Sequence, residues 1–153
     1  MKLQEEIKQT KPFHSLQQEA ALALLKTADL VRRHVAKIIS PHKLSLEQYN
    51  VLRILRGAGG AGMATLEVSS RMIEQTPAIT RLLDKLEAKD LVRRERCPED
   101  RRQVLCWITE AGLRLLARLD DAVESADQEL FTCLSIAEVK HLISLLDRMR
   151  DEK

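Results

Sequence analysis

The spacing of hydrophobic residues along the chain predicts a mainly helical protein whose first clear element is one long helix. Between Ser15 and about Ser40, apolar residues recur at intervals of three and four, which places them on one face of an α-helix. These residues are Leu24, Ala28, Val31, Val35 and Ile38. Pro41 is expected to end the helix, because the residue before a proline disfavours the helical conformation.

The next predicted helix carries start and stop patterns at both ends. Ser45 and Gln48 form a capping-box pattern, in which each side chain accepts a hydrogen bond from a free backbone N–H group. The helix is expected to run through Arg56 and to stop at Gly57, since glycine readily adopts the left-handed conformation of a C-terminal cap.

Two further helices are expected to begin at threonines. Thr65 is expected to cap a short helix to about Met72, and its apolar anchors are Leu66 and Val68. Thr76 is expected to cap the following helix, with Pro77 at its first position, where a missing N–H costs nothing, and an end near Lys89. Its apolar face consists of Ile79, Leu82, Leu83 and Leu86. The opposite side is left with Pro77, Ala78, Thr80, Arg81, Asp84 and Lys85.

After Leu91 the hydrophobic period changes from helical to alternating. Residues 104–108 alternate as in a strand, and a turn-forming loop over 97–102 separates them from residues 91–96. The pattern predicts a two-stranded hairpin with a charged tip. Two closing helices follow, capped by Thr109 and by Ser135 with Glu138. Each has a stripe of apolar residues along one face. The stripe of the first consists of Leu116, Leu119, Val123, Ala126 and Leu130, and that of the second of Val139, Leu142, Ile143, Leu146 and Met149.

Length and composition indicate one globular domain. The chain has 153 residues and a mass of 17.4 kDa, with 44% hydrophobic and 31% charged residues. Its longest apolar stretch, Ala20–Leu25, is too short to cross a bilayer, and the polar segment Met1–Thr10 lacks the apolar region of a signal peptide. Three widely spaced cysteines do not form a secreted disulfide framework. We therefore expect a cytoplasmic protein without membrane contact.

Charge is distributed unevenly along the chain. Residues 1–109 hold 19 Lys and Arg against 13 Asp and Glu, whereas residues 110–153 hold 6 against 10. The first part therefore favours an anionic partner. Aromatic residues are only 3%, which argues against a stacking platform for single-stranded nucleic acid. The glycine-rich run 57–62 has no following Lys-Ser/Thr pattern, so a flexible turn is favoured over a phosphate-binding loop.

Two short helices, a recognition-like helix and then a basic hairpin together describe a winged helix-turn-helix. Such a helix fits the major groove of double-stranded DNA, and the hairpin tip with Arg101 and Arg102 could reach the minor groove or the phosphates. The alternative is that the arginines only solvate an ordinary hairpin. They are Arg93, Arg94, Arg96, Arg101 and Arg102.

Four stretches in this order resemble the MarR family of bacterial transcription regulators. They are Thr76–Glu87, Leu91–Arg94, Pro98–Arg102 and Ile108–Gly112. The resemblance extends over nearly the whole chain, including Leu44–Tyr49 and the long first helix. The chain departs from the family at Asp90, where glycine is usual, but aspartate tolerates a left-handed conformation better than most residues.

The resemblance implies a mainly α fold with a small β-hairpin wing. A single domain over residues 1–153 would combine a winged helix-turn-helix lobe at about 44–109 with dimerisation helices at 10–40 and 110–150. It also implies a homodimer that represses transcription from a pseudo-palindromic operator and is released by a small phenolic or aromatic effector. The alternative for the outer helices is an intramolecular cap on a monomer.

By the same resemblance, base recognition falls to the start of the recognition helix and minor-groove contact to Arg101. The DNA-binding residues implied are Thr76, Pro77, Ala78, Thr80, Arg81, Lys85, Arg101 and Arg102. Lys85 could equally be a solvated surface lysine. Asp100 is expected to orient a neighbouring arginine, because phosphates repel a carboxylate.

Other chemistries find less support in the sequence. Cys97, beside Arg96, could sense oxidants, although an incidental surface thiol is the simpler interpretation, and Cys106 is expected to be buried packing. The four histidines are scattered and imply no metal site or cofactor. No local pattern indicates an enzyme. A winged helix that binds another protein remains the main alternative to a DNA-binding regulator.

Overall fold

The computed structural model describes residues 2–100 and 102–151. The helices are α1 (Leu3–Glu6), α2 (Leu16–Ile39), α3 (Leu46–Ala58), α4 (Thr65–Ser70), α5 (Ile79–Glu87), α6 (Glu110–Leu130) and α7 (Ile136–Asp151). The strands are β1 (Met63–Ala64), β2 (Val92–Arg96) and β3 (Val104–Ile108), and 3₁₀ turns occupy Ser40–His42 and Gly59–Ala61. The predicted class, mainly α with a small β wing, is confirmed.

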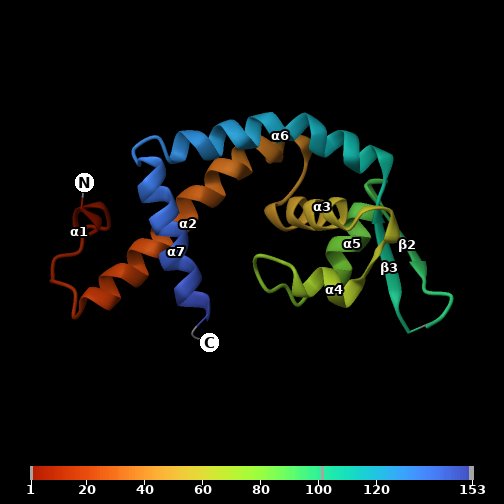
Figure 1. The fold of residues 1–153 in the computed structure, drawn as a ribbon, viewed down its shortest axis with the longest axis horizontal. Helices are drawn as coiled ribbons and strands as arrows, with labels where there is room; N and C mark the ends of the chain where they lie inside the picture. The colour runs from red at the N-terminus through yellow and green to blue at the C-terminus, as the bar shows by residue number, and fades with distance from the viewer. Residues whose placement is uncertain (1, 101, 152–153) are drawn as a thin grey trace.

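Two regions of the molecule are joined by α6. Helices α3, α4 and α5 pack with the sheet into a lobe, while α1, α2 and α7 extend to the other side, and α6 arches over both (Figure 1). Among the described residues, the helices lack the length and apolar character that a bilayer-crossing segment requires.

The caps predicted for α2 and α3 are confirmed, but the predicted stop at Gly57 is wrong. Ser15 accepts a hydrogen bond from the Gln18 N–H, and the Ser45–Gln48 capping box is complete in both directions. Helix α3 runs through Gly57 and ends at Gly59, which has a φ of 65°. The left-handed conformation that ends this helix therefore falls two residues later in the glycine-rich run.

Neither threonine predicted as a cap of the next two helices acts as one. Ala64 is the N-cap of α4, and the Thr65 hydroxyl instead donates to the Val104 carbonyl oxygen at 3.2 Å. Helix α5 begins at Ile79 after Ala78, and the Thr76 hydroxyl donates to a backbone carbonyl of the preceding turn. Tertiary contacts with β3 and the turn geometry override the local capping pattern in both cases.

The hairpin is confirmed, and a third strand joins it. The sheet has the order β1-β3-β2, with antiparallel pairing that sets Met63 opposite Cys106 and Val92 opposite Ile108. A strand of two residues is too short to show alternation, so the sequence did not reveal β1.

The turn between α5 and β2 accommodates the departure at Asp90. Asp90 has a φ of 57°, in the left-handed region, and its carbonyl accepts a hydrogen bond from the Thr109 hydroxyl at 2.6 Å. The same hydroxyl accepts from the Gly112 N–H at 3.1 Å, which confirms Thr109 as the cap of α6. One threonine thus fixes this turn and the start of α6 together.

A single hydrophobic core fills the lobe and continues under α6. Leu52, Leu55, Leu83, Leu86 and Leu116 are almost completely inaccessible. The predicted stripe of α6 is buried as far as Ala126 and only partly covered at Leu130. In α7, by contrast, no residue is buried, and Ile143 and Met149 of its predicted stripe are more than half exposed within the described chain.

The helical position of Gly57 has a measurable consequence. We expect Gly57→Ala to raise the free energy of unfolding by roughly 0.5–1 kcal/mol, because alanine favours the helical backbone and its Cβ meets no described atom within 4 Å. Gly112→Ala should lower it by roughly 1–3 kcal/mol, since a Cβ there lies 2.6 Å from the Leu91 carbonyl oxygen. Urea denaturation at one protein concentration measures both, and destabilisation by Gly57→Ala would contradict the helical assignment.

Candidate nucleic-acid interface

Helix α5 is anchored on one side and exposed on the other. Leu83 and Leu86 are fully buried, so the helix cannot turn without losing core packing. Of the predicted site residues here, Pro77, Thr80, Arg81 and Lys85 are exposed, and Thr76 and Ala78 are half-buried in the turn that precedes α5. The polar face predicted for this helix is confirmed for Thr80 and Arg81.

The two cationic side chains of α5 lack intramolecular partners among the described residues. Within residues 2–100 and 102–151, neither Arg81 nor Lys85 forms a side-chain hydrogen bond or an ion pair. Their charges are therefore available to an anionic partner. Asp84 and Glu87 of the same helix, in contrast, are both engaged by the sheet.

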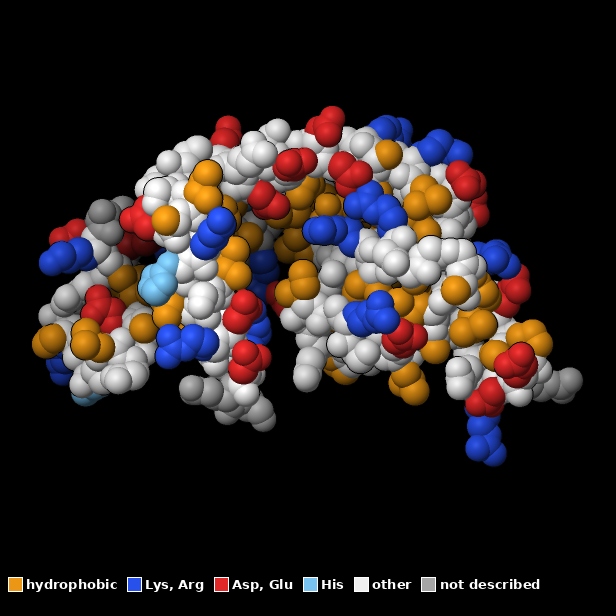
Figure 2. Space-filling model, in the orientation of Figure 1, with side chains coloured by type: hydrophobic (Ala, Val, Ile, Leu, Met, Phe, Trp, Pro, Cys, Tyr) orange, Lys and Arg blue, Asp and Glu red, His pale blue; other side chains and the backbone are white. Residues whose placement is uncertain are grey.

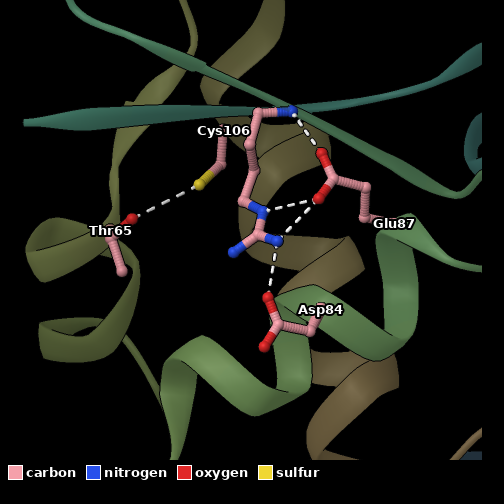
Figure 3. A network of polar contacts seen from close by, with 5 residues as sticks. Thr65, Asp84, Glu87 and Cys106 are labelled. Atoms are coloured by element: carbon pink, nitrogen blue, oxygen red, sulfur yellow. Dashed lines mark hydrogen bonds and ion pairs between the residues drawn. The ribbon is translucent and has the colours of Figure 1, made fainter.

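Arg94 of β2 connects the sheet to α5 by ion pairs with Asp84 and Glu87, the two carboxylates labelled in Figure 3. Its Nη2 donates to Asp84 Oδ1 and to Glu87 Oε2, each at 2.6 Å, and its Nε donates to Glu87 Oε2 at 3.0 Å. The Arg94 backbone N–H also donates to Glu87, and the arginine side chain is only 19% exposed. The hydrogen bonds that Arg94 donates to Glu87 raise the pKa of Arg94 above its ordinary value. Arg94 is therefore a structural residue, not one of the solvating arginines considered from the sequence.

Arg93 has a different role at the base of the wing. Its guanidinium lies 4.5 Å from the centre of the Trp107 ring and also pairs with Glu95. The Trp107 Nε1 donates to the Gly60 carbonyl oxygen at 3.2 Å, and the Trp107 ring leaves no room for a side chain at Gly62. The glycine-rich run is therefore the packing site of the tryptophan, which the sequence did not indicate.

The tip of the wing is described in part. Arg101 lies outside the described residues, and Arg102 is exposed. Asp100 Oδ1 accepts from the Arg102 backbone N–H at 3.0 Å, and Asp100 Oδ2 accepts from the Gln103 side chain at 3.3 Å. Asp100 thus orders the turn of the tip through the backbone of a neighbouring arginine rather than through its guanidinium.

A groove of about 410 Å³ lies between α4, α5 and β3. It brings together Thr80 of the recognition helix and Arg102 of the wing, two residues that the sequence predicts for the site. Leu66, expected to be an apolar anchor, is 82% exposed on this groove, whereas Val68 is buried as expected. The expectation for Leu66 is wrong because α4 presents that position outward.

A second cavity, of about 460 Å³, lies between α2, α3, α6 and the segment joining α4 to α5. Hydrophobic side chains lie in a hollow beneath the arch of α6 (Figure 2). The apolar wall of the cavity is formed by Val31, Val35, Leu46, Tyr49, Met72, Ile73 and Val123. Polar side chains complete it: Arg32, Glu47, Asn50, Arg53, Glu74 and Asp127. These residues come from four separate segments, so no pattern in the sequence could bring them together.

Five charged side chains line this cavity: Arg32, Glu47, Arg53, Glu74 and Asp127. Arg53 lies 5.8 Å from the centre of the Tyr49 ring, and burial raises the pKa of the Tyr49 hydroxyl. Arg32 forms an ion pair with Glu74 across the mouth. The cavity thus combines an apolar floor with charged groups that could orient a ligand.

The three cysteines differ in their exposure. Cys106 is buried, as expected for packing, and burial raises the pKa of its thiol. Its sulfur lies 3.6 Å from the Thr65 hydroxyl (Figure 3). Cys97 is half-buried and Cys133 exposed, and the described residues contain no group of three metal-binding side chains.

Comparison with known proteins agrees with this geometry. The sequence profile described as "MarR family" matches residues 44–104. The HTH-type transcriptional regulator TtmR of Methylorubrum extorquens is 30% identical over 138 residues, which cover 90% of this chain and 69% of that protein.

Solved structures extend the likeness to the whole fold. A MarR transcription factor from Planctomyces limnophilus is 41% identical, with a TM-score of 0.69 over 89% of this chain and 98% of its own. The fold is also shared, with a TM-score of 0.80 and 24% identity over 92% of this chain and 99% of the other, by Bordetella bronchiseptica BpsR. That structure is described as "Mechanism for regulation of DNA binding of Bordetella bronchiseptica BpsR by 6-hydroxynicotinic acid". The chain therefore belongs to the MarR family of DNA-binding transcriptional regulators, which are not enzymes.

Proposed function

We propose that this regulator represses transcription by binding a pseudo-palindromic operator as a homodimer, and that a small ligand releases it. The observation that carries the proposal is the groove lined by both Thr80 of α5 and Arg102 of the wing, next to Arg81, which forms no ion pair within the described residues. A helix and a cationic wing on one surface suit adjacent grooves of duplex DNA. A dimer bound at a promoter would repress transcription by occluding that promoter.

The proposed DNA contacts fall into two groups. Base recognition is assigned to the start of α5 and its approach, at Thr76, Pro77, Ala78, Thr80 and Arg81. Phosphate or minor-groove contact is assigned to Lys85, Arg101 and Arg102, whose cationic groups favour the negative potential of DNA.

The proposed dimer rests on the outer helices at residues 10–40 and 110–150. Apolar side chains there stay exposed in the single chain, and α7 buries none of its own residues. They include Leu25, Leu30, Ile136, Ile143 and Met149. Several large apolar side chains left exposed on the same few helices suit a protein interface. The lobe at 44–109 is then left free to contact DNA.

The proposed ligand site is the cavity beneath α6. It lies between α2 and the lobe, so a bound ligand would touch both the proposed dimer region and the approach to α5. An aromatic or phenolic compound fits its apolar wall and charged rim. The regulation of BpsR by 6-hydroxynicotinic acid supports this class of effector for the shared fold.

The symmetry of the operator tests the central proposal. Selection from a random DNA pool should yield a pseudo-palindrome with half-sites about 34–36 Å, or ~10 base pairs, apart. Sedimentation at micromolar concentration should give the mass of a dimer. A selected site without symmetry, bound by a single chain, would contradict the proposal. Failure to bind any duplex at low salt would instead favour a protein-binding winged helix.

Substitution of two arginines separates base recognition from electrostatic contact. Arg81→Ala should cost roughly 1–3 kcal/mol of binding free energy on the selected site and relax discrimination at one base pair. Arg101→Ala should weaken binding to all sequences. It should also reduce the slope of the logarithm of the binding constant against the logarithm of the salt concentration by about one. Binding isotherms on matched and singly substituted sites measure both, and equal losses for Arg81→Ala on every sequence would refute its role in base recognition.

Ligand control predicts reciprocal linkage. An effector in the cavity should weaken operator binding by roughly 1–3 kcal/mol, and saturating operator should weaken effector binding by the same amount. Titration calorimetry with and without DNA can follow any phenolic acid that raises the melting temperature. Compounds that raise it but leave DNA affinity unchanged would not be effectors.

A further inference from the structure

The approach to the recognition helix is held mainly by contacts from outside its own segment. The Ile73 backbone N–H donates to Asn50 Oδ1 of α3 at 2.9 Å, and the Glu74 carboxylate pairs with Arg32 of α2. The Ile73 side chain is 84% exposed, so packing at this residue adds little to its position. Two polar contacts therefore hold this stretch, next to Met72, which packs against the core.

The start of α5 relies on these contacts and on the packing of Ile79 against the core, because its N-cap makes no side-chain hydrogen bond. Its N-cap is Ala78, which has no side chain able to accept a hydrogen bond from the free N–H groups of the first turn. Glu74 lies five residues before the first residue of the helix, Ile79. If Glu74 moves, Thr76 and Pro77 are expected to move with it, because they lie between Glu74 and the helix. Both residues are assigned to base recognition.

The Arg32–Glu74 pair also joins the two functional regions of the molecule. Arg32 belongs to α2, outside the DNA-binding lobe, whereas Glu74 belongs to the lobe. Both side chains line the cavity beneath α6, so a ligand that enters it meets the pair. The two side chains are 48% and 50% exposed, and an exposed ion pair of this kind contributes little to global stability. The pair can therefore open without unfolding the protein.

We propose that Arg32 and Glu74 are positioning residues for DNA binding: their ion pair fixes the recognition helix relative to α2, and ligands act on DNA binding by opening it. This inference rests on the proposed function. With the pair closed, the start of α5 has one position in each protomer, set by the helix that we assign to the dimer region. With the pair open, that segment must be ordered when DNA binds, which lowers affinity.

The charge change in each variant makes the test selective. Glu74→Gln removes a negative charge from the lobe, which by simple electrostatics would strengthen binding to DNA. The proposal requires the opposite. Arg32→Gln removes a positive charge, so it needs a control with the same charge change on the same helix. Arg33→Gln provides this control, because Arg33 pairs only with Asp29, within α2, in the described chain.

The experiment measures the affinity of each full-length variant for the selected operator by fluorescence anisotropy, together with its thermal unfolding. We expect Arg32→Gln and Glu74→Gln to bind roughly three- to tenfold more weakly than the wild type, with melting temperatures nearly unchanged. Arg33→Gln should bind within about twofold of the wild type. The charge swap, Arg32→Glu with Glu74→Arg, should restore affinity, because it rebuilds the pair in reverse.

Each outcome decides between the two proposals. Wild-type affinity in Glu74→Gln, or a swap as weak as the single variants, would overturn the positioning role while leaving the DNA-binding function intact. An equal loss in Arg33→Gln would show a general charge effect and would also overturn it. A wild-type protein that binds no duplex would remove the proposed function and this inference together.

Discussion

The arrangement of the DNA-binding lobe depends on the ion pairs that Arg94 makes between β2 and α5. This half-buried guanidinium binds two carboxylates of the recognition helix and is itself held by the hairpin. The pairing keeps the helix and the wing in one relative position. It also offsets one of the two negative charges of Asp84 and Glu87, which would otherwise oppose an anionic partner. The remaining cations of the helix, Arg81 and Lys85, then dominate its exposed face.

Helix α6 covers the core of the lobe but leaves apolar side chains of α2 and α7 exposed. Its buried stripe completes the core of the lobe, and Arg56 of α3 binds Asp120 of α6 through both carboxylate oxygens at 3.0 and 2.8 Å. Hydrogen bonding to Asp120 raises the pKa of Arg56. Beyond this region, α2 and α7 keep apolar side chains that the single chain does not cover. The lobe is therefore a packed unit, while the outer helices present an open surface.

The cavity beneath α6 lies where these two regions meet. Its wall combines α2, α3, α6 and the approach to α5, so its occupant would contact the segment that leads into α5. The Arg32–Glu74 pair is the direct connection across it. The cavity is lined by Met72, Ile73 and Glu74, and Glu74 lies only five residues before the first residue of α5, Ile79.

Much of this protein was determined by the sequence itself. Helical stripes, the Ser45–Gln48 capping box, the Thr109 cap and the 91–108 hairpin are local patterns set by hydrogen bonding and periodicity within a few residues. The exposed face of α5 with Thr80 and Arg81 followed from the same periodicity. Together with the order of its motifs, this was enough to identify the family.

Tertiary structure alone decided the features that depend on distant residues. Thr65 lost its predicted capping role to a hydrogen bond with the Val104 carbonyl oxygen of β3, 39 residues away in the chain. The structural role of Arg94, the packing of Trp107 on the glycine-rich run and the whole cavity appeared only in the fold. The physical reason is that ion pairs and cavities join side chains far apart in the chain, and neither periodicity nor capping carries information about such distances.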